Sequence, residues 1–291
     1  MLPTLTECLA YPHQNLVSKR YGYFEESPSD SLIQGDAGLI VFDERFRSLM
    51  GTEPSFELIA EDATKPFAHE AGVYMPNTGD IFITSNHIRR DGKKHVQISK
   101  VTRINTAIAE SDGIEDHRYE VERICTEPEI LMANGGVNYK DGVLFCEQGS
   151  LTEPGGLTYM RATADPRTGN YTTRTLLSNY YGRWFNSVND VIVAKNSNIW
   201  FTDPPYGYEQ GIRPVPQLPA QTYCFDPVKG AVRAVDDSLK KPNGLCFSPD
   251  QKTLASVYLR FRHCDKKREP LLDQQKAIRI RRLWNPRRNQ V

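Results

Sequence analysis

The sequence predicts an all-β protein, on the evidence of its short apolar runs, the turns that bound them and a repeat. The runs are rich in Ile, Val, Phe, Tyr and Thr, and Gly, Pro, Asn and Asp lie between them, as is typical of strands joined by tight turns. Helical periodicity is scarce in the body of the chain. The clearest runs are residues 38–42, 80–84, 142–146 and 198–202.

One strand–turn–strand phrase recurs along the chain. Its turns lie at 77–80, 140–142, 196–198 and 249–252, with a spacing of roughly 60 residues that somewhat exceeds the period of common propeller repeats. A second apolar stretch precedes each turn, and further stretches follow, as at 222–225 and 231–235. Four strands per unit predict the antiparallel blades of a β-propeller, of which about four are present. Tandem unrelated hairpins are the alternative.

Both ends of the chain depart from this repeated strand-and-turn pattern. Residues 1–37 form an N-terminal segment, and 39–51 are expected to be an outer strand of the kind that closes a propeller. The predicted propeller spans residues 38–257. Residues 258–291 hold 11 Lys and Arg against 3 Asp and Glu. This basic run is expected to be a poorly ordered tail with helix-compatible patches at 269–283, and contact with nucleic acid or an anionic membrane is the alternative.

Composition narrows the classes of function. The net charge is zero, and because the tail is basic the remainder is acidic, which argues against nucleic acid as the main partner. No apolar run approaches the ~18 residues of a membrane span, and no secretory signal is seen at the N-terminus. We therefore expect a cytoplasmic location and no membrane. The six cysteines show no zinc-binding spacing and are expected to be buried, reduced thiols.

Common enzyme motifs are missing, but oxygen-bearing side chains recur at equivalent points. There is no HExxH, GxSxG, Walker loop or dinucleotide-binding fingerprint. Instead, carboxylate or amide residues lie directly ahead of the innermost strand of successive units: Glu70, Asn134, Asn189 with Asp190, and Asn243. Such a ring around a propeller axis would suit Ca²⁺, which could polarise a carbonyl group. The alternative is that each Asn only serves its turn.

Several phrases resemble the SMP-30/gluconolactonase/LRE-like family, in its fungal lactonohydrolase-like branch. They are residues 185–190 (Phe-Asn-Ser-Val-Asn-Asp), 199–207, 223–227 and 241–250, within a match from about 38 to 254. The resemblance implies a six-bladed propeller with a central divalent metal, usually calcium, and hydrolysis of lactones such as aldonolactones.

The resemblance also assigns roles to individual residues. By motif, Glu70, Asn189 and Asn243 match three metal ligands, and Asp190 supports them from a second shell. Asn134 is expected in that shell or against substrate. Asp203 is likewise expected in the second shell or against substrate. The loop that it begins matches a segment near the pocket mouth, and its alternative role is that of a rigid turn after a strand.

The chain departs from the family pattern in ways that bear on activity. The fourth ligand, an Asp in a later Pro-Asp-Gly phrase that is also often assigned proton transfer, has no match after Asn243. Trp184 and Val188 stand where relatives commonly have Arg and Pro. The residues and the resemblance together imply a calcium-dependent lactone hydrolase that lacks its last blades. Its catalytic residue is unassigned, and we expect the missing blades to impair its activity. A non-catalytic propeller fragment that acts by binding is the alternative.

Overall fold

The computed structural model describes residues 47–50, 59–60, 62, 64–104, 118–261 and 274–282. The chain divides into two compact units, Met1–Ile59 and Ala60–Val291. In the first unit, helix α2 spans Arg47–Met50. The expected outer strand at 39–51 is therefore wrong over these four residues, where Arg, Leu and Met all have high helix propensity. The predicted segment 1–37 and the predicted start of the propeller at residue 38 lie outside the described residues.

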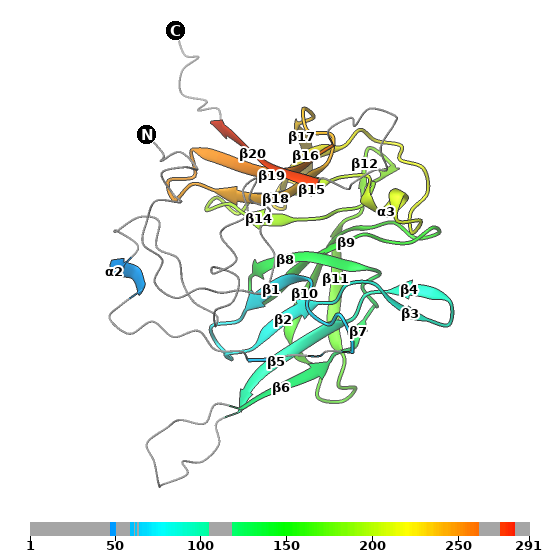
Figure 1. Cartoon of the computed structure of the whole chain (residues 1–291), viewed down its shortest axis with the longest axis vertical. Helices are drawn as coiled ribbons and strands as arrows, with labels where there is room; N and C mark the ends of the chain where they lie inside the picture. The colour runs from blue at the N-terminus through cyan, green and yellow to red at the C-terminus, as the bar shows by residue number, and fades with distance from the viewer. Residues whose placement is uncertain are drawn as a thin grey trace, which may run out of the picture. The chain divides into compact units, whose positions relative to one another are not determined.

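The second unit is built mainly of strands, as predicted (Figure 1). Four sheets follow one another along the chain, with the strand orders β1-β2-β5-β6, β7-β11-β10-β9-β8, β14-β15-β16-β17 and β18-β19-β20. All neighbouring strands in them are antiparallel, except that β7 and β11 are parallel.

The bounds of these strands agree closely with the predicted apolar runs between residues 71 and 254. The first sheet consists of β1 (Glu70–Tyr74), β2 (Ile81–Thr84), β5 (Ile98–Ile104) and β6 (Arg118–Arg123). The second consists of β7 (Thr126–Glu127), β8 (Ala133–Tyr139), β9 (Gly142–Glu147), β10 (Gly156–Ala164) and β11 (Tyr171–Leu177). The third consists of β14 (Val191–Val193), β15 (Ile199–Asp203), β16 (Gln221–Asp226) and β17 (Ala231–Asp236). The fourth consists of β18 (Pro242–Phe247), β19 (Thr253–Phe261) and β20 (Gln274–Arg282).

Smaller elements connect or extend these sheets. Strands β3 (Ile88–Arg90) and β4 (Lys93–His95) form a hairpin between β2 and β5. Strands β12 (Asn179–Tyr180) and β13 (Arg183–Trp184) form another ahead of β14. Helix α3 (Tyr206–Glu209) follows β15. Among the described residues, no helix is both long enough and apolar enough to cross a bilayer.

The first hairpin turn of each sheet contains a residue with a left-handed backbone conformation. One residue in it adopts a positive φ, at Gly79 (76°), Lys140 (54°), Ser197 (66°) and Gln251 (53°). A left-handed residue lets the chain reverse within a few positions, which tight hairpins need. The recurrence confirms that the four predicted turns are equivalent.

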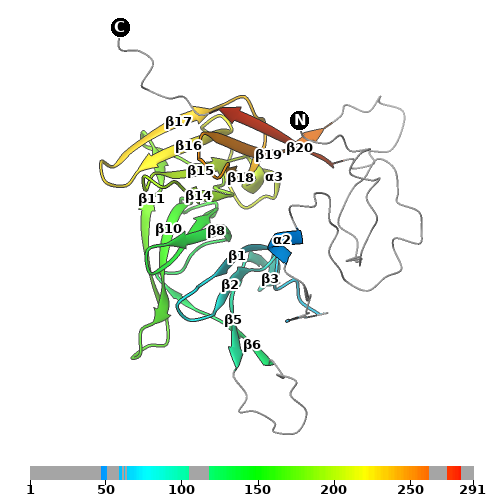
Figure 2. The same ribbon diagram turned by 90° about the vertical axis from the view of Figure 1, so that its left-hand side faces the viewer.

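Alternating side chains pack successive sheets face to face. Along β9, Val143 and Phe145 join the core that includes Phe82 of the first sheet. Leu144 and Cys146 point the other way and join the core that includes Phe201 of the third sheet. All six residues of β9 are buried, because the cores shared with the first and third sheets cover its two faces. In Figure 2, the labelled strands β8, β10 and β11 of this sheet lie between the first sheet and the third.

The structure differs from the prediction near the C-terminus. Strand β19 continues past residue 257 to Phe261 and pairs along its whole length with β20. The predicted boundary at 257/258 therefore falls inside a strand, and residues 274–282 are extended rather than helical. Their Ala-Ile-Arg-Ile-Arg pattern repeats every second residue, which matches a strand better than a helix.

The cysteines only partly follow expectation. Cys146 and Cys224 are buried free thiols, whereas Cys125 and Cys246 are exposed. Cys246 lies on β18, an edge strand of its sheet, between Leu245 and Phe247, so its side chain faces away from the buried side.

Candidate functional site

The residues predicted to form an oxygen-rich ring all lie at or just before the start of an edge strand of a sheet. Glu70 is the first residue of β1, Asn134 and Asn243 are the second residues of β8 and β18, and Asn189 and Asp190 directly precede β14. These strands contact one another in series, β1 with β8, β8 with β14 and β14 with β18. The fold thus brings together the segments that carry the predicted residues.

Hydrogen bonds join these segments from one sheet to the next. Between the second and third sheets, the Gly135 N–H donates to the Asn189 carbonyl oxygen (3.0 Å). An ideal Cβ on Gly135 would lie 2.5 Å from that oxygen, so only glycine permits this approach. Between the third and fourth sheets, the Leu245 N–H donates to Asp190 Oδ2 (2.6 Å).

Two buried threonines make the same contact in different sheets. Thr84 Oγ1 donates to the Asn134 carbonyl oxygen (3.1 Å), and Thr202 Oγ1 donates to the Asn243 carbonyl oxygen (2.8 Å). Each threonine lies near the end of a second strand and holds the predicted residue of the following sheet. The phrases Ile-Phe-Ile-Thr and Ile-Trp-Phe-Thr carry this signal in the sequence, although the prediction did not use it.

Asn189 is only 6% exposed, and its backbone is fixed on both sides. Its N–H donates to the Thr202 carbonyl oxygen (3.0 Å), and its own carbonyl oxygen accepts from Gly135. Its side-chain amide makes no hydrogen bond to any residue that the structure describes. The amide oxygen of Asn189 is therefore available to a further partner.

Two acidic residues brace the segment that carries Asn189. The Asp190 carboxylate accepts from the N–H groups of Val191 (2.9 Å) and Leu245 (2.6 Å), and burial raises its pKa. The Asp203 carboxylate is completely buried and accepts from the N–H groups of Asn186 (2.9 Å) and Ser187 (2.7 Å). Burial raises the pKa of Asp203 to about 7, against the opposing effect of these donors.

Arg213 is a structural residue that no sequence motif marks. It is 3% exposed, and its guanidinium donates four hydrogen bonds to backbone carbonyl oxygens. The acceptors, with distances, are Asn186 (3.1 Å), Phe185 (2.9 Å), Ser150 (2.6 Å) and Glu153 (2.6 Å). The guanidinium also lies 5.4 Å from the Trp184 ring centroid. Arg213 therefore clamps the 150–153 loop to the segment that leads into Asn189.

Helix α3 adds a hydroxyl group to the site. Tyr206, its first residue, accepts a hydrogen bond at Oη from Asn243 Nδ2 (3.5 Å). His69 precedes Glu70, and its Nε2 lies 3.9 Å from Glu70 Oε1. No three His, Cys, Asp or Glu side chains gather as a metal site within the described residues. A cation here would therefore depend on amide oxygens as well as a carboxylate.

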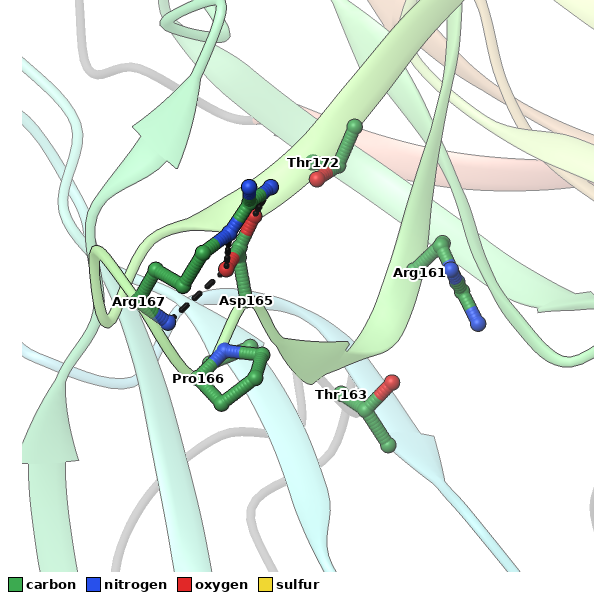
Figure 3. A pocket seen from close by; sticks show the side chains of 7 residues that line it. Arg161, Thr163, Asp165, Pro166, Arg167 and Thr172 are labelled. Carbon is green, nitrogen blue, oxygen red and sulfur yellow. Dashed lines mark hydrogen bonds and ion pairs between the residues drawn. The ribbon is translucent and has the colours of Figure 1, made fainter.

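A separate shallow pocket lies at the turn between β10 and β11 (Figure 3). Its lining includes Arg161 and Arg167 but none of the predicted site residues. Both cations are already paired, Arg167 with Asp165 at 3.2 Å and Arg161 with Asp141 at 3.8 Å. We therefore do not regard this pocket as the functional site.

Repeated β-sheets, with oxygen-bearing side chains where neighbouring sheets meet, define the general class of this protein. Residues 121–258 match the family described as the SMP-30/gluconolactonase/LRE-like region. The chain is 32% identical over 238 residues to lactonohydrolase oryL of Aspergillus oryzae (strain ATCC 42149 / RIB 40). This alignment covers 80% of this chain and 49% of the relative. Residues 121–258 of this chain therefore belong to the SMP-30/gluconolactonase/LRE-like family.

The chain is also similar to a second lactonohydrolase and to a solved structure. The chain is 25% identical to lactonohydrolase oryH of the same organism, across 80% of this chain and 58% of that protein. It thus spans about half the length of the curated lactonohydrolases that it matches. A gluconolactonase structure from Xanthomonas campestris is 21% identical, with a TM-score of 0.47, across 67% of this chain and 56% of that one.

Proposed function

We propose that this chain is a calcium-dependent lactone hydrolase on a β-propeller of the six-bladed type, with the metal held by Glu70, Asn189 and Asn243. The observation that carries the proposal is the series of contacts joining β1, β8, β14 and β18, with Asn189 in the middle, whose side-chain amide makes no hydrogen bond to a described residue. Similarity to two lactonohydrolases supports the substrate class.

The donor chemistry of these residues fits calcium. One carboxylate and two amide carbonyl groups are hard oxygen ligands, and their low total charge would leave positions for water and substrate. Asn243 turns its Nδ2 toward Tyr206, so its Oδ1 remains for another partner. A metal ion would also give the Oδ1 atom of Asn189 a partner. When bound, calcium would polarise the lactone carbonyl toward attack by water.

The chain's own residues supply the rigidity that such a site needs. Asp190 ties the third sheet to the fourth, while Asp203 and Arg213 hold the segment from Phe185 to Ser187. Supporting residues of this kind keep ligands in the geometry that binding requires. We propose that Asp190 and Asp203 serve the metal in this indirect way, with Asn134 beside them.

The test is hydrolysis of gluconolactone by the purified full chain, followed as acid release with calcium and then with a chelator. Glu70→Gln should reduce hydrolysis and remove the calcium-dependent rise in melting temperature, since it takes the only carboxylate from the ligand set. Glu120→Gln is the matched control, because Glu120 is an exposed carboxylate on the outermost strand of the same sheet. It should leave both measurements unchanged.

Three outcomes separate the possibilities. Chelator-sensitive hydrolysis that Glu70→Gln weakens supports the proposal. A calcium-dependent melting shift without hydrolysis would show a propeller that binds metal but does not turn over lactones. If neither calcium nor Glu70→Gln changed the melting temperature or the rate, the proposed metal site would be wrong.

A further inference from the structure

Tyr206 places a hydroxyl group beside Asn243, one of the three proposed metal ligands. Its Oη lies 3.5 Å from Asn243 Nδ2. Burial raises the pKa of Tyr206, and the negative charges of Glu209 and Glu70 act in the same direction. The Tyr206 side chain is half-buried, so it is neither enclosed in the core nor free in solvent.

Helix α3, which carries Tyr206, is fixed to two sheets. The Lys241 ammonium contacts both carboxylate oxygens of Glu209, at 2.6 and 2.7 Å, just ahead of β18. On the other side, Lys94 Nζ of β4 donates to the Gln210 carbonyl oxygen (2.6 Å). The β3–β4 hairpin connects β2 and β5 of the first sheet, and Lys241 directly precedes β18, which carries Asn243. The tyrosine is therefore held in a fixed position next to the Asn243 segment. Fixed groups of this kind act on a substrate without first having to be ordered.

The hydrogen bonding of Tyr206 leaves its own proton available. Its Oη accepts from Asn243 Nδ2, and a phenol has one hydrogen to donate. Within the described part of the chain, no acceptor takes that hydrogen. Tyr206 therefore offers an unused donor at the edge of the oxygen-ligand site.

We propose that Tyr206 contacts the substrate and donates its hydroxyl hydrogen bond to the carbonyl oxygen of the lactone. The inference rests on the proposed lactone hydrolysis and adds a residue to it. As water adds to the carbonyl carbon, negative charge builds on this oxygen, and a fixed donor stabilises that charge. The O–H bond of Tyr206 stays intact throughout, so no proton leaves the phenol.

The experiment compares Tyr206→Phe with Tyr208→Phe in the full chain. Tyr206→Phe removes one oxygen and keeps the ring, while Tyr208 lies in the same helix with 47% exposure. For Tyr206→Phe we expect kcat for gluconolactone to fall about 100-fold, as when one donor to a developing oxyanion is lost. KM and the calcium-dependent melting shift should change little. Tyr208→Phe should match the wild type in all three measurements.

A second measurement tests the contact without turnover. The lactam of gluconic acid presents the same ring carbonyl, and its affinity can be measured by calorimetry. Tyr206→Phe should weaken lactam binding about fivefold, as expected for one hydrogen bond. Equal lactam affinity in wild type and Tyr206→Phe would overturn the proposed contact.

The outcomes distinguish this inference from the proposed function. A wild-type chain that does not hydrolyse lactone refutes the proposed function, while lactam binding still decides the role of Tyr206. Active wild type with unchanged kcat in Tyr206→Phe refutes only the inference. Loss of the calcium-dependent shift in Tyr206→Phe would also overturn it, because Tyr206 would then act by orienting Asn243.

Discussion

Replacing Arg213 with methionine should destabilise the protein strongly. Met keeps much of the apolar stem but removes the guanidinium and its four hydrogen bonds to buried or half-buried backbone carbonyl groups. A hydrogen bond from a charged donor contributes about 1.5–3 kcal/mol, and water entering the gap would recover part of this. The change also leaves Asp203 without its nearby cation. We expect the free energy of unfolding to fall by about 3–5 kcal/mol.

Two further variants control for charge and for size. Arg167→Met removes an arginine whose side chain is 87% exposed and paired only with Asp165, so it should have little effect. Arg213→Lys keeps the charge, but its single ammonium group cannot reach both the 150–153 loop and the 185–186 segment as the planar guanidinium does. Its loss of stability should lie between those of Arg213→Met and the wild type.

Urea unfolding followed by tryptophan fluorescence measures this effect. Trp184 provides a local probe, because its ring lies beside the Arg213 guanidinium. If Arg213→Met lost less than about 1 kcal/mol, or no more than Arg167→Met, the four contacts would not be what fixes the segment ahead of Asn189.

Two more predictions concern the same region. Gly135→Ala should weaken the calcium-dependent rise in melting temperature, because its Cβ would lie 2.5 Å from the Asn189 carbonyl oxygen, whereas the Cβ of Gly244→Ala would meet nothing closer than 3.7 Å. Equal melting shifts in the two variants would contradict this reasoning. Burial raises the pKa of Asp203 to about 7 from an ordinary 3.8, so the folded chain binds this proton more tightly than the unfolded chain. The contribution of Asp203 to the free energy of unfolding should therefore decrease as the pH rises from about 4 through about 7, and Asp203→Asn should flatten that part of the pH profile. An unchanged slope in urea titrations at several pH values would count against the assignment.

The repeated strands could be predicted because their signals are local. Alternating apolar residues, and turns that need a left-handed residue, specify a strand and its hairpin within about ten positions. The predicted starts of β1, β8, β14 and β18 follow from the same phrases, so the positions of Glu70, Asn134, Asn189 and Asn243 at strand entrances were readable from the chain. The strand β20 was not predicted, because the basic charge of this stretch favoured a tail, although its apolar residues alternate every second position as in a strand.

The sequence by itself thus determined the repeating strands and the residue types offered at their entrances. Only the tertiary structure decided which distant groups support them. Arg213 contacts the 150–153 loop from about 60 positions away in the sequence, and Tyr206 of helix α3 contacts Asn243 of β18. Nothing near either residue in the sequence marks these contacts, because loop side chains acquire partners only when packed sheets bring separate segments together.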